Sequence, residues 1–272
     1  AVEAGLVRGI KIYPVKNLNE IIKHLNGLKK EKIKNQIRTK AMDYNDKFEN
    51  DFSFIKGQEN AKRALEISAS GGHNISMYGP PGTGKTMLAK AFQSILPALQ
   101  YEEILEVTGI HSIAKILEKP YITRPPFRSP HHTSSHISLI GGGSFPRPGE
   151  ITLAHRGVLF LDEFPEFDKK SIEALRQPLE DHKITVSRAS GSLTFPAQFM
   201  LFAAQNPCPC GFLGDIKRNC TCMPGQIANY KRRISGPLLD RIDIYLEVPA
   251  VEIDKLSGNL QSEASNSIRE RV

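Results

Sequence analysis

Two separate segments of this chain carry residue types whose spacing suits the hydrolysis of a nucleoside triphosphate. The first matches the pattern G-x-x-x-x-G-K-[ST] and runs from Gly79 to Thr86. Its glycines would let successive backbone N–H groups point at phosphate oxygens. Lys85 would add a positive charge at the β- and γ-phosphates, and the Thr86 hydroxyl would be a ligand of Mg²⁺.

The segments on either side of this loop fit the same interpretation. Residues 73–78 predict a short buried strand, and residues 86–96 predict a helix whose positive N-terminal end would face the anion. This is the context that the pattern requires, and it argues against an ordinary glycine-rich turn. We therefore expect ATP to contact the loop and the first helical residues, namely Gly79, Pro80, Pro81, Gly82, Thr83, Gly84, Lys85, Thr86 and Met87.

The second segment is an apolar run, residues 158–161, that ends in two adjacent acids. Such a run predicts a buried parallel strand, and its carboxyl end would place both acids beside the bound phosphates. Asp162 would hold Mg²⁺, and Glu163 would polarise the attacking water. The alternative is an ordinary strand with exposed acids at its tip. The phosphate-binding loop favours the catalytic interpretation, and the presence of Glu163 favours hydrolysis over nucleotide binding alone.

The length and composition of the chain limit the classes of protein to which it can belong. With 272 residues, it can form one large α/β core and a small appendage. No segment has the pattern of a transmembrane helix or of a secretory signal, so we expect the cytoplasm and no membrane partner. The sequence starts at Ala1, and residues 267–272 resemble an unfinished helix, so we expect a fragment of a longer protein.

The chain carries a net charge of +7, which weakly favours a polyanionic partner. Part of this charge lies in a local run that only Glu31 opposes: Lys23, Lys29, Lys30, Lys32, Lys34, Arg38 and Lys40. The run has no aromatic residues between its charges. A solvated linker is therefore favoured over a nucleic-acid groove.

All four cysteines lie close together in the sequence, first Cys208 and Cys210, then Cys220 and Cys222. In a cytoplasmic chain, clustered thiols indicate a metal more often than disulfides. Four thiolates would suit tetrahedral Zn²⁺. However, one residue separates the members of each pair, which is closer than the usual spacing of zinc ligands. Free reduced thiols are the alternative.

Apolar patterns predict an alternation of strands and helices along the chain. Strands are expected at residues 8–15, 73–78, 104–107, 198–204 and 242–248. Helices are expected at residues 17–25, 58–70, 86–96, 169–179, 226–234 and 237–239. The core would start near Phe52. Such alternation favours an α/β fold in which helices flank a parallel sheet.

Two segments depart from this alternation. Residues 120–150 contain many prolines and glycines, which predicts an inserted functional loop. In this loop, His132 and His136 have the i,i+4 spacing of metal ligands, but a polar loop that faces a pore or a partner is favoured because no acid or thiol accompanies them. Residues 183–188 and 193–196 flank a glycine-containing tip and predict a β-hairpin.

The order of these features resembles that of AAA+ ATPases: Asp162-Glu163, then Asn206 after a later strand, then Arg241. The hairpin resembles the pre-sensor hairpin of the helicase-related branch. Longer motifs resemble the magnesium-chelatase-like group, namely Phe127-Arg-Ser-Pro-His-His-Thr133, Pro148-Gly-Glu-Ile-Thr-Leu-Ala-His-Arg-Gly157, Asn206-Pro-Cys-Pro-Cys-Gly211 and Ser235-Gly-Pro-Leu-Leu-Asp-Arg241. The paired cysteines and the N-terminal piece are most similar to the bacterial ComM/YifB members.

The resemblance implies a fold and a division into domains. The fold is an α/β P-loop NTPase (AAA+) core with a helix-2 insert, a pre-sensor-1 β-hairpin and a helical lid that is largely missing. Residues 1–26 would end a Lon-protease-like-fold domain, residues 27–50 would be a linker, and residues 51–250 would be the ATPase core. Residues 251–272 would start the truncated lid.

The resemblance also implies roles for single residues. Asn206 would act as the sensor of the γ-phosphate or the lytic water, with a strand-end turn residue as the alternative. Arg241 would act in trans on the transferring phosphoryl group of a neighbouring subunit. Its alternative is a surface ion pair with Asp240 or Asp243. Other candidates for this finger are Arg232 and Arg233. A finger supplied in trans implies a closed ring, by resemblance a homo-hexamer.

Such rings move DNA through a central pore. Basic residues of the hairpin and of the inserted loop would contact phosphates, namely Lys183, Arg188, Arg124, Arg128, His131 and His132. The alternative is that these residues pack subunits together. The function implied is an ATP-driven branch-migration helicase acting in natural transformation. Two alternatives are a magnesium-chelatase motor subunit for metal insertion into a porphyrin and an ATP-binding scaffold that remodels proteins.

Overall fold

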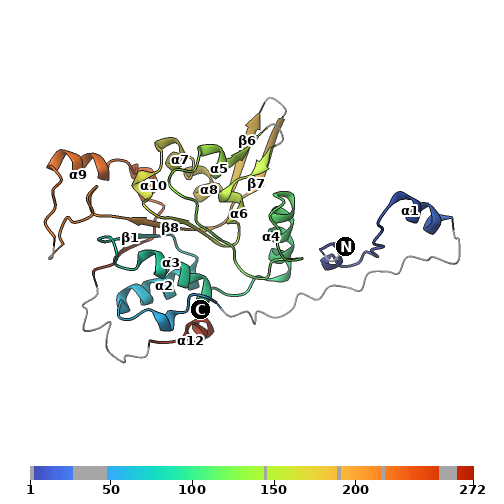
Figure 1. Cartoon of the computed structure of the whole chain (residues 1–272), viewed down its shortest axis with the longest axis horizontal. Coiled ribbons are helices and arrows are strands. Elements are labelled where there is room, and N and C mark those ends of the chain that lie inside the picture. Colours follow the sequence, from blue (N-terminus) through green and yellow to red (C-terminus); the bar gives the residue numbers. More distant parts are fainter. Residues whose placement is uncertain (1–2, 27–47, 144–145, 189–190, 216–217, 251–261) are drawn as a thin grey trace. The chain divides into compact units, whose positions relative to one another are not determined.

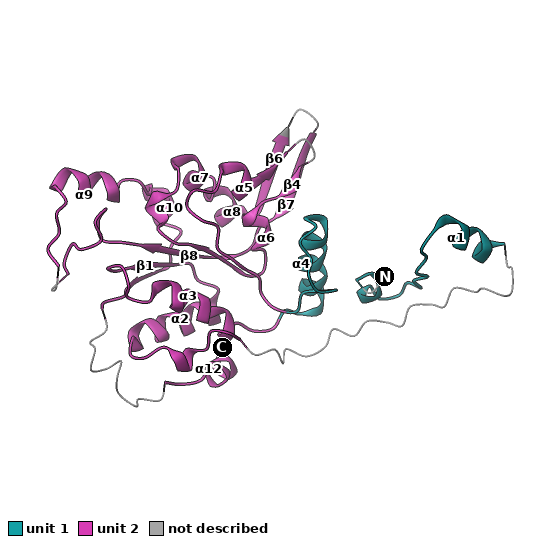
Figure 2. Ribbon diagram, viewed as in Figure 1, with its two compact units in different colours: residues 1–44, 99–123 teal, residues 45–98, 124–272 magenta. Residues whose placement is uncertain are grey.

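The computed structural model describes residues 3–26, 48–143, 146–188, 191–215, 218–250 and 262–272. The chain divides into two compact units, one of residues 1–44 and 99–123 and the other of residues 45–98 and 124–272 (Figure 2). Most of the predicted linker and residues 251–261 of the predicted lid lie outside the described residues. No helix in the described ranges combines the length and the apolar character that a membrane crossing requires.

In the first unit, the predicted helix at residues 17–25 is confirmed, but the predicted strand at residues 8–15 is wrong. Helix α1 (Leu18–Leu25) begins after Asn17, whose side chain accepts the backbone N–H of Glu20. Residues 8–15 form no strand. Gly9 adopts a φ of +83° and Ile10 is 57% exposed, so this segment neither stays extended nor buries its apolar side chains.

The strand predicted at residues 104–107 is also wrong, because this segment belongs to helix α4 (Tyr101–Ile113). Gln100 and Glu103 form a capping box that starts the helix. Ile104 and Val107 then lie three residues apart on one helical face, and both pack in a small buried cluster of this unit. A short apolar run fits either period, and here local capping decides in favour of the helix.

The second unit contains a five-stranded sheet in which every pairing is parallel, as predicted (Figure 1). Its strands, in spatial order, are β2 (Phe127–Arg128), β5 (Val158–Leu161), β8 (Met200–Gln205), β1 (Ile75–Tyr78) and β9 (Ile244–Glu247). Strand β2 lies inside the segment predicted as an inserted loop, so that prediction is corrected: this segment supplies an edge strand. It also contains α5 (His136–Ile140), β3 (Gly141–Gly142) and β4 (Arg147–Pro148), and α6 (Glu150–Leu153) begins at its last residue.

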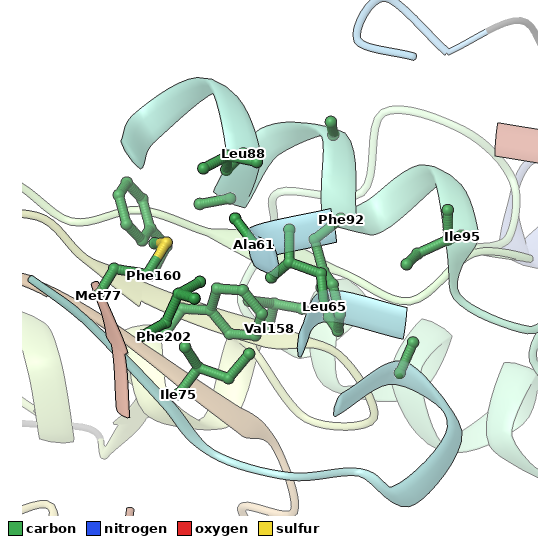
Figure 3. Close-up of a cluster of buried hydrophobic side chains, with 14 of the residues drawn as sticks. Ala61, Leu65, Ile75, Met77, Leu88, Phe92, Ile95, Val158, Phe160 and Phe202 are labelled. Atoms are coloured by element: carbon green, nitrogen blue, oxygen red, sulfur yellow. The ribbon is translucent and has the colours of Figure 1, made fainter. Parts of the chain in front are cut away.

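Alternate residues of the central strands β5 and β8 face two different hydrophobic clusters. Val158 and Phe160 pack on one face of the sheet with helices α2 (Glu59–Gly71) and α3 (Lys85–Phe92), as Figure 3 shows. Phe202 packs against Phe92 in the same cluster, with ring centroids 4.4 Å apart and ring planes tilted by 43°. Leu159 and Leu161 face the opposite cluster, which includes α5, α6 and α10 (Gly236–Leu239). Burial on both faces explains why these strands are continuous apolar runs.

The remaining elements follow the predictions with one further correction. The hairpin is confirmed as β6 (Lys183–Arg188) paired with β7 (Gly191–Pro196), and its tip at residues 189–190 lies outside the described residues. The single helix predicted at residues 169–179 is instead two, α7 (Lys169–Glu173) and α8 (Arg176–Asp181). Pro178 explains the break, because it cannot donate to the carbonyl of Ala174 and its ring crowds that group. Helix α9 covers Pro224–Lys231, and α12 covers Ser265–Arg271.

Candidate active site

The phosphate-binding loop lies between β1 and α3, as its sequence predicts. Gly82 and Gly84 adopt φ angles of +79° and +90°, which only glycine tolerates without strain. Gly79 is required for a different reason. A Cβ atom at this position would lie 2.2 Å from the carbonyl oxygen of Val248, the residue that follows the neighbouring strand β9. The loop conformation therefore requires glycine at positions 82 and 84, and the packing against the residue after β9 requires glycine at position 79.

Lys85 is 7% exposed, and its ammonium group joins three parts of the loop region. Its Nζ donates to the carbonyl oxygens of Gly79 at 2.7 Å and Pro80 at 2.8 Å, and to Oδ1 of Asn206 at 3.2 Å. Burial lowers the pKa of Lys85, and the charge of Asp162 acts in the opposite direction. The structure thus brings together Lys85 and Asn206, which the sequence separates widely but which we predicted to act on the same phosphate.

Thr86, the residue after Lys85, contacts Asp162 in the same cleft. The Thr86 hydroxyl donates to Oδ2 of Asp162 at 2.7 Å, and the backbone N–H of Glu163 donates to Oδ1 at 3.0 Å. These neighbouring oxygen atoms are hard donors of the kind that Mg²⁺ prefers. The residues present therefore fit the predicted magnesium site, in which Thr86 and Asp162 would be the protein ligands.

Glu163 is held by a histidine that the sequence assigned to another role. Nδ1 of His132 lies 2.8 Å from Oε2 of Glu163, and the two side chains are 29% and 50% exposed. Glu163 has a φ of +52°, an uncommon conformation for a residue other than glycine. We predicted His132 as a DNA contact or as a partner of His136 in a metal site. The paired histidines of the Phe127–Thr133 motif were the only signal, and they did not indicate a carboxylate partner.

The predicted nucleotide residues line one cleft of about 420 Å³. Its walls are Pro81, Gly82, Thr83, Gly84, Lys85, Thr86, Met87, Asp162, Glu163 and Asn206. Gly79 and Pro80 do not line the cleft, but their carbonyl oxygens accept hydrogen bonds from Lys85. The cleft thus holds amide donors, one cation and two carboxylates, the set of groups that can bind a triphosphate, hold a divalent cation and activate a water.

Two of the three candidate arginine fingers, Arg241 and Arg233, have partners within the chain. Nη2 of Arg241 lies 2.6 Å from Oε1 of Glu180, rather than beside Asp240 or Asp243. Arg241 does not line the cleft of its own chain. Arg233 pairs with Glu166 at 2.7 Å, and Arg232 is exposed. The Arg241–Glu180 contact could not have been predicted, because it depends on how α8 packs beside the turn before β9.

The predicted DNA contacts fall into two groups. Lys183 is exposed at the start of the hairpin, whereas the side chain of Arg188 lies outside the described residues. Arg128 forms a bidentate ion pair with Glu150, at 2.6 and 2.8 Å. The guanidinium of Arg124 lies 4.0 Å from the ring centroid of Phe48. Arg124 and Arg128, the two arginines predicted to contact DNA from the inserted segment, therefore contact protein groups in this structure.

The four cysteines also come together. Their sulfur atoms all lie within 4.8 Å of one another. In the part of the chain that the structure describes, this is the one group of three or more histidine, cysteine or acidic residues that is close enough to share a metal ion. The histidines of the inserted segment form no such group there.

Comparison with known proteins gives matches of three kinds. A family model described as magnesium chelatase, subunit ChlI, matches residues 51–256. The uncharacterized protein YifB of Escherichia coli is 48% identical over 227 residues, which cover 82% of this chain and 44% of YifB. The competence protein ComM of Haemophilus influenzae is 43% identical over 278 residues, which cover 99% of this chain and 53% of ComM. The chain thus spans about half the length of the curated relatives it matches.

More distant matches are a replication protein and a solved structure. The DNA replication licensing factor mcm7 of Schizosaccharomyces pombe is 25% identical over 167 residues, 56% of this chain and 20% of mcm7. The crystal structure of NtrX from Brucella abortus in complex with ADP has a TM-score of 0.47 and 19% identity, and the match covers 72% of this chain and 37% of NtrX.

Proposed function

Because this chain belongs to the family of magnesium chelatase, subunit ChlI, we propose that it hydrolyses ATP and that the full-length protein is a ring-shaped motor acting on DNA. The chain is a magnesium-chelatase-like AAA+ protein of the ComM/YifB type, as its motifs predicted. Everything finer, including the helicase activity, the hexamer and the cytoplasmic location, is part of the proposal.

One observation carries the ATPase proposal: Lys85 contacts Asn206 at 3.2 Å while the next residue, Thr86, contacts Asp162 at 2.7 Å. The phosphate-binding loop, Asn206 and the acidic end of β5 therefore line one cleft. The backbone N–H groups of the loop would bind the phosphates, and the Lys85 ammonium can exchange its carbonyl partners for phosphate oxygens. Bound Mg²⁺ would neutralise charge on the β- and γ-phosphates. Asn206 would orient the water, and Glu163 would accept its proton.

The ring proposal rests on Arg241, which lies outside the cleft of its own chain. Its ion pair with Glu180 is 41% exposed on both sides, and exposed pairs of this kind contribute little stability. Arg241 can therefore leave Glu180 to enter a neighbour's site at small cost. There its charge would offset the negative charge that develops on the transferring phosphoryl group. The neighbour-to-neighbour contact that results is heterologous and closes into a ring, which we propose to be a hexamer.

The DNA proposal is supported by the outer face of the hairpin. Ile184 and Val186 point into the core, so the alternate residues of β6 face outward. Two hydroxyl pairs cross this face, Thr185 with Thr194 and Ser187 with Ser192, each at 3.0 Å. Lysine and hydroxyl side chains are common donors to phosphate oxygens and do not read sequence. A face with Lys183 at one end and a row of hydroxyls fits a DNA backbone.

Two relatives support the same task by name. ComM is a competence protein, and mcm7 is a DNA replication licensing factor. We therefore propose branch migration during natural transformation as the work of the full-length protein. The family description favours a second candidate, a motor subunit for magnesium insertion into a porphyrin.

The discriminating experiment measures ATP hydrolysis by the full-length protein with single-stranded, duplex or branched DNA, with a porphyrin, and with neither. Branched or single-stranded DNA is expected to raise kcat several-fold. The Lys183→Ala variant should lose this stimulation but keep its basal rate. Lys90→Ala is the matched control, since Lys90 is exposed on α3. Equal rates under all DNA conditions would remove the motor function. Stimulation by the porphyrin alone would favour the second candidate.

A further inference from the structure

The four cysteines form a compact cluster at the end of the sheet that carries the active site. Sγ of Cys208 lies 3.3 Å from that of Cys210 and 3.6 Å from that of Cys220, and Cys210 and Cys220 are 3.6 Å apart. Cys208 and Cys210 follow β8, whereas Cys220 and Cys222 precede α9. The cluster therefore ties together the two ends of one loop.

These distances fit a metal better than they fit a disulfide. Sulfurs at about 2.3 Å from a tetrahedral Zn²⁺ lie about 3.8 Å from one another. The separations among Cys208, Cys210 and Cys220 are 3.3 to 3.6 Å, close to that spacing, and all four sulfurs lie within 4.8 Å of one another. They are well beyond a disulfide, in which sulfurs are about 2.05 Å apart. The C-x-C spacing is closer than is usual for zinc ligands, but the two sulfurs of a pair can still reach adjacent corners of one tetrahedron.

The backbone around the cluster supports thiolate ligands. The N–H of Cys210 points at Sγ of Cys222, 3.4 Å away, and so supplies a donor to a sulfur that would carry negative charge. Gly211 and Gly214 adopt φ angles of +85° and +82°, which allow the tight turns after the first pair. Cys208 is buried and the other three cysteines are partly buried, so the cluster is largely shielded from bulk water.

The same loop touches the candidate active site at two points. Asn206, which accepts from Lys85, precedes Cys208 by two residues. Gly211 packs so closely on the phosphate-binding loop that a Cβ atom there would lie 2.8 Å from Cδ of Pro81. The position of this loop therefore bears on both Asn206 and Pro81.

We propose that Cys208, Cys210, Cys220 and Cys222 bind one structural Zn²⁺, which holds Asn206 and Pro81 in place for nucleotide binding. Binding exchanges the four thiol protons for the metal and releases them to solvent, without any change of oxidation state. The metal closes the loop between β8 and α9 in the way that a structural zinc closes a small module. The effect on the nucleotide rests on the proposed function, whereas the metal site itself does not.

The test of the metal site uses the full chain, purified without added metal from cells grown with zinc. Elemental analysis is expected to find about one zinc per chain. Replacement of zinc by Co²⁺ should give sulfur-to-cobalt charge-transfer absorption, which is the signature of thiolate ligands. The Cys220→Ser variant should lose most of the metal. Thr221→Ala is the matched control, because Thr221 is exposed between two of the ligands and offers no thiol, and it should keep the metal.

Circular dichroism of Cys220→Ser separates loss of metal from loss of fold. Less than about a tenth of a mole of zinc per mole of wild-type chain, with four thiols that react at once with a thiol reagent, would overturn the site. Charge-transfer bands that are equally strong in Cys220→Ser would overturn it as well, because the metal would then lie elsewhere.

The effect on the nucleotide is tested by chelation of the wild-type chain. Removal of zinc should weaken binding of a fluorescent ATP analogue several-fold, and readdition of zinc should restore it. Unchanged affinity would overturn the role in positioning Asn206 and Pro81. A chain that holds zinc but does not hydrolyse ATP would instead contradict the proposed function and leave the metal site standing.

Discussion

His132 and Glu163 come from separate segments and meet at the mouth of the nucleotide cleft, with Nδ1 and Oε2 2.8 Å apart. His132 follows the edge strand β2, and Glu163 follows the adjacent strand β5. The carboxyl ends of parallel neighbours point to the same side of a sheet, which explains how the two side chains meet. The segment that contains β2 thereby gains direct contact with the proposed general base.

We predict that His132→Ala lowers kcat for ATP hydrolysis about 3- to 10-fold and changes KM little, because the Glu163 carboxylate loses the group that orients it. His132→Gln should recover part of the rate, since an amide N–H can still donate to the carboxylate. Steady-state kinetics separates kcat from KM. The control is His131→Ala, because His131 bonds to Thr133 rather than to Glu163. An unchanged kcat in His132→Ala would show that this contact has no part in orienting Glu163.

Replacement of the proposed base itself should have a larger effect. Glu163→Gln should lower kcat about 10²- to 10⁴-fold, because the amide cannot accept a proton from water. Affinity for ATP should stay within about threefold, since the loop and Lys85 are unchanged. The control Glu173→Gln makes the same change on α7, where Glu173 faces Arg176 at 3.6 Å. A rate like that of the wild type in Glu163→Gln would contradict the assignment.

Lys85→Ala should act on binding rather than on chemistry alone. The variant removes the buried cation that lies between the loop carbonyls and Asn206, so ATP affinity should fall about 10- to 100-fold. Titration with a fluorescent ATP analogue measures this change. Lys90→Ala removes an exposed lysine of the same helix and should bind ATP normally. Equal affinities of the two variants would place the triphosphate elsewhere.

Strands that are buried on both faces can be recognised from a single sequence, whereas short apolar runs cannot be assigned to helix or strand without their context. Strands β5 and β8 pack against hydrophobic clusters on both faces, so their apolar runs stand out from the surrounding polar residues. The short run at residues 104–107 is ambiguous, and its helix depends on the capping box of Gln100 and Glu103. Strand β2 has two residues inside a proline-rich segment, and its pairing with β5 makes it a strand.

In the candidate site too, some features follow from local sequence motifs and others depend on how distant segments pack. The phosphate-binding loop and the acidic pair act through local motifs, and the structure brings them together in one cleft. The partners of His132 and Arg241 depend on how distant segments pack, so the sequence could not indicate them. The break between α7 and α8 was missed although Pro178 was a visible signal, because the apolar pattern alone continues through it.

Gly79→Ala should test the close approach between the loop and strand β9. The added Cβ would lie 2.2 Å from the carbonyl oxygen of Val248, so backbone has to move. We expect the free energy of unfolding to fall by about 1–3 kcal/mol, as for other strained insertions. Gly225→Ala is the control, because a Cβ there meets nothing within 4 Å and should be neutral or slightly stabilising. Thermal denaturation compares the two, and equal stability would mean that the loop and β9 can separate without cost.

If Arg241 acts on the neighbouring subunit, Arg241→Ala should lower kcat for ATP hydrolysis by the full-length ring about 10³-fold. Breaking its exposed pair with Glu180 should cost less than about 1 kcal/mol of stability, so the fold remains.

The decisive measurement mixes two inactive proteins, Arg241→Ala and Glu163→Gln. In a mixed ring, an Arg241→Ala subunit keeps its base, and an adjacent Glu163→Gln subunit supplies the arginine. Roughly a quarter of the contacts should then combine both intact groups, and activity should return on mixing. A mixture as inactive as its components, in rings shown to exchange subunits, would place Arg241 in the same subunit as the site it serves or outside catalysis altogether.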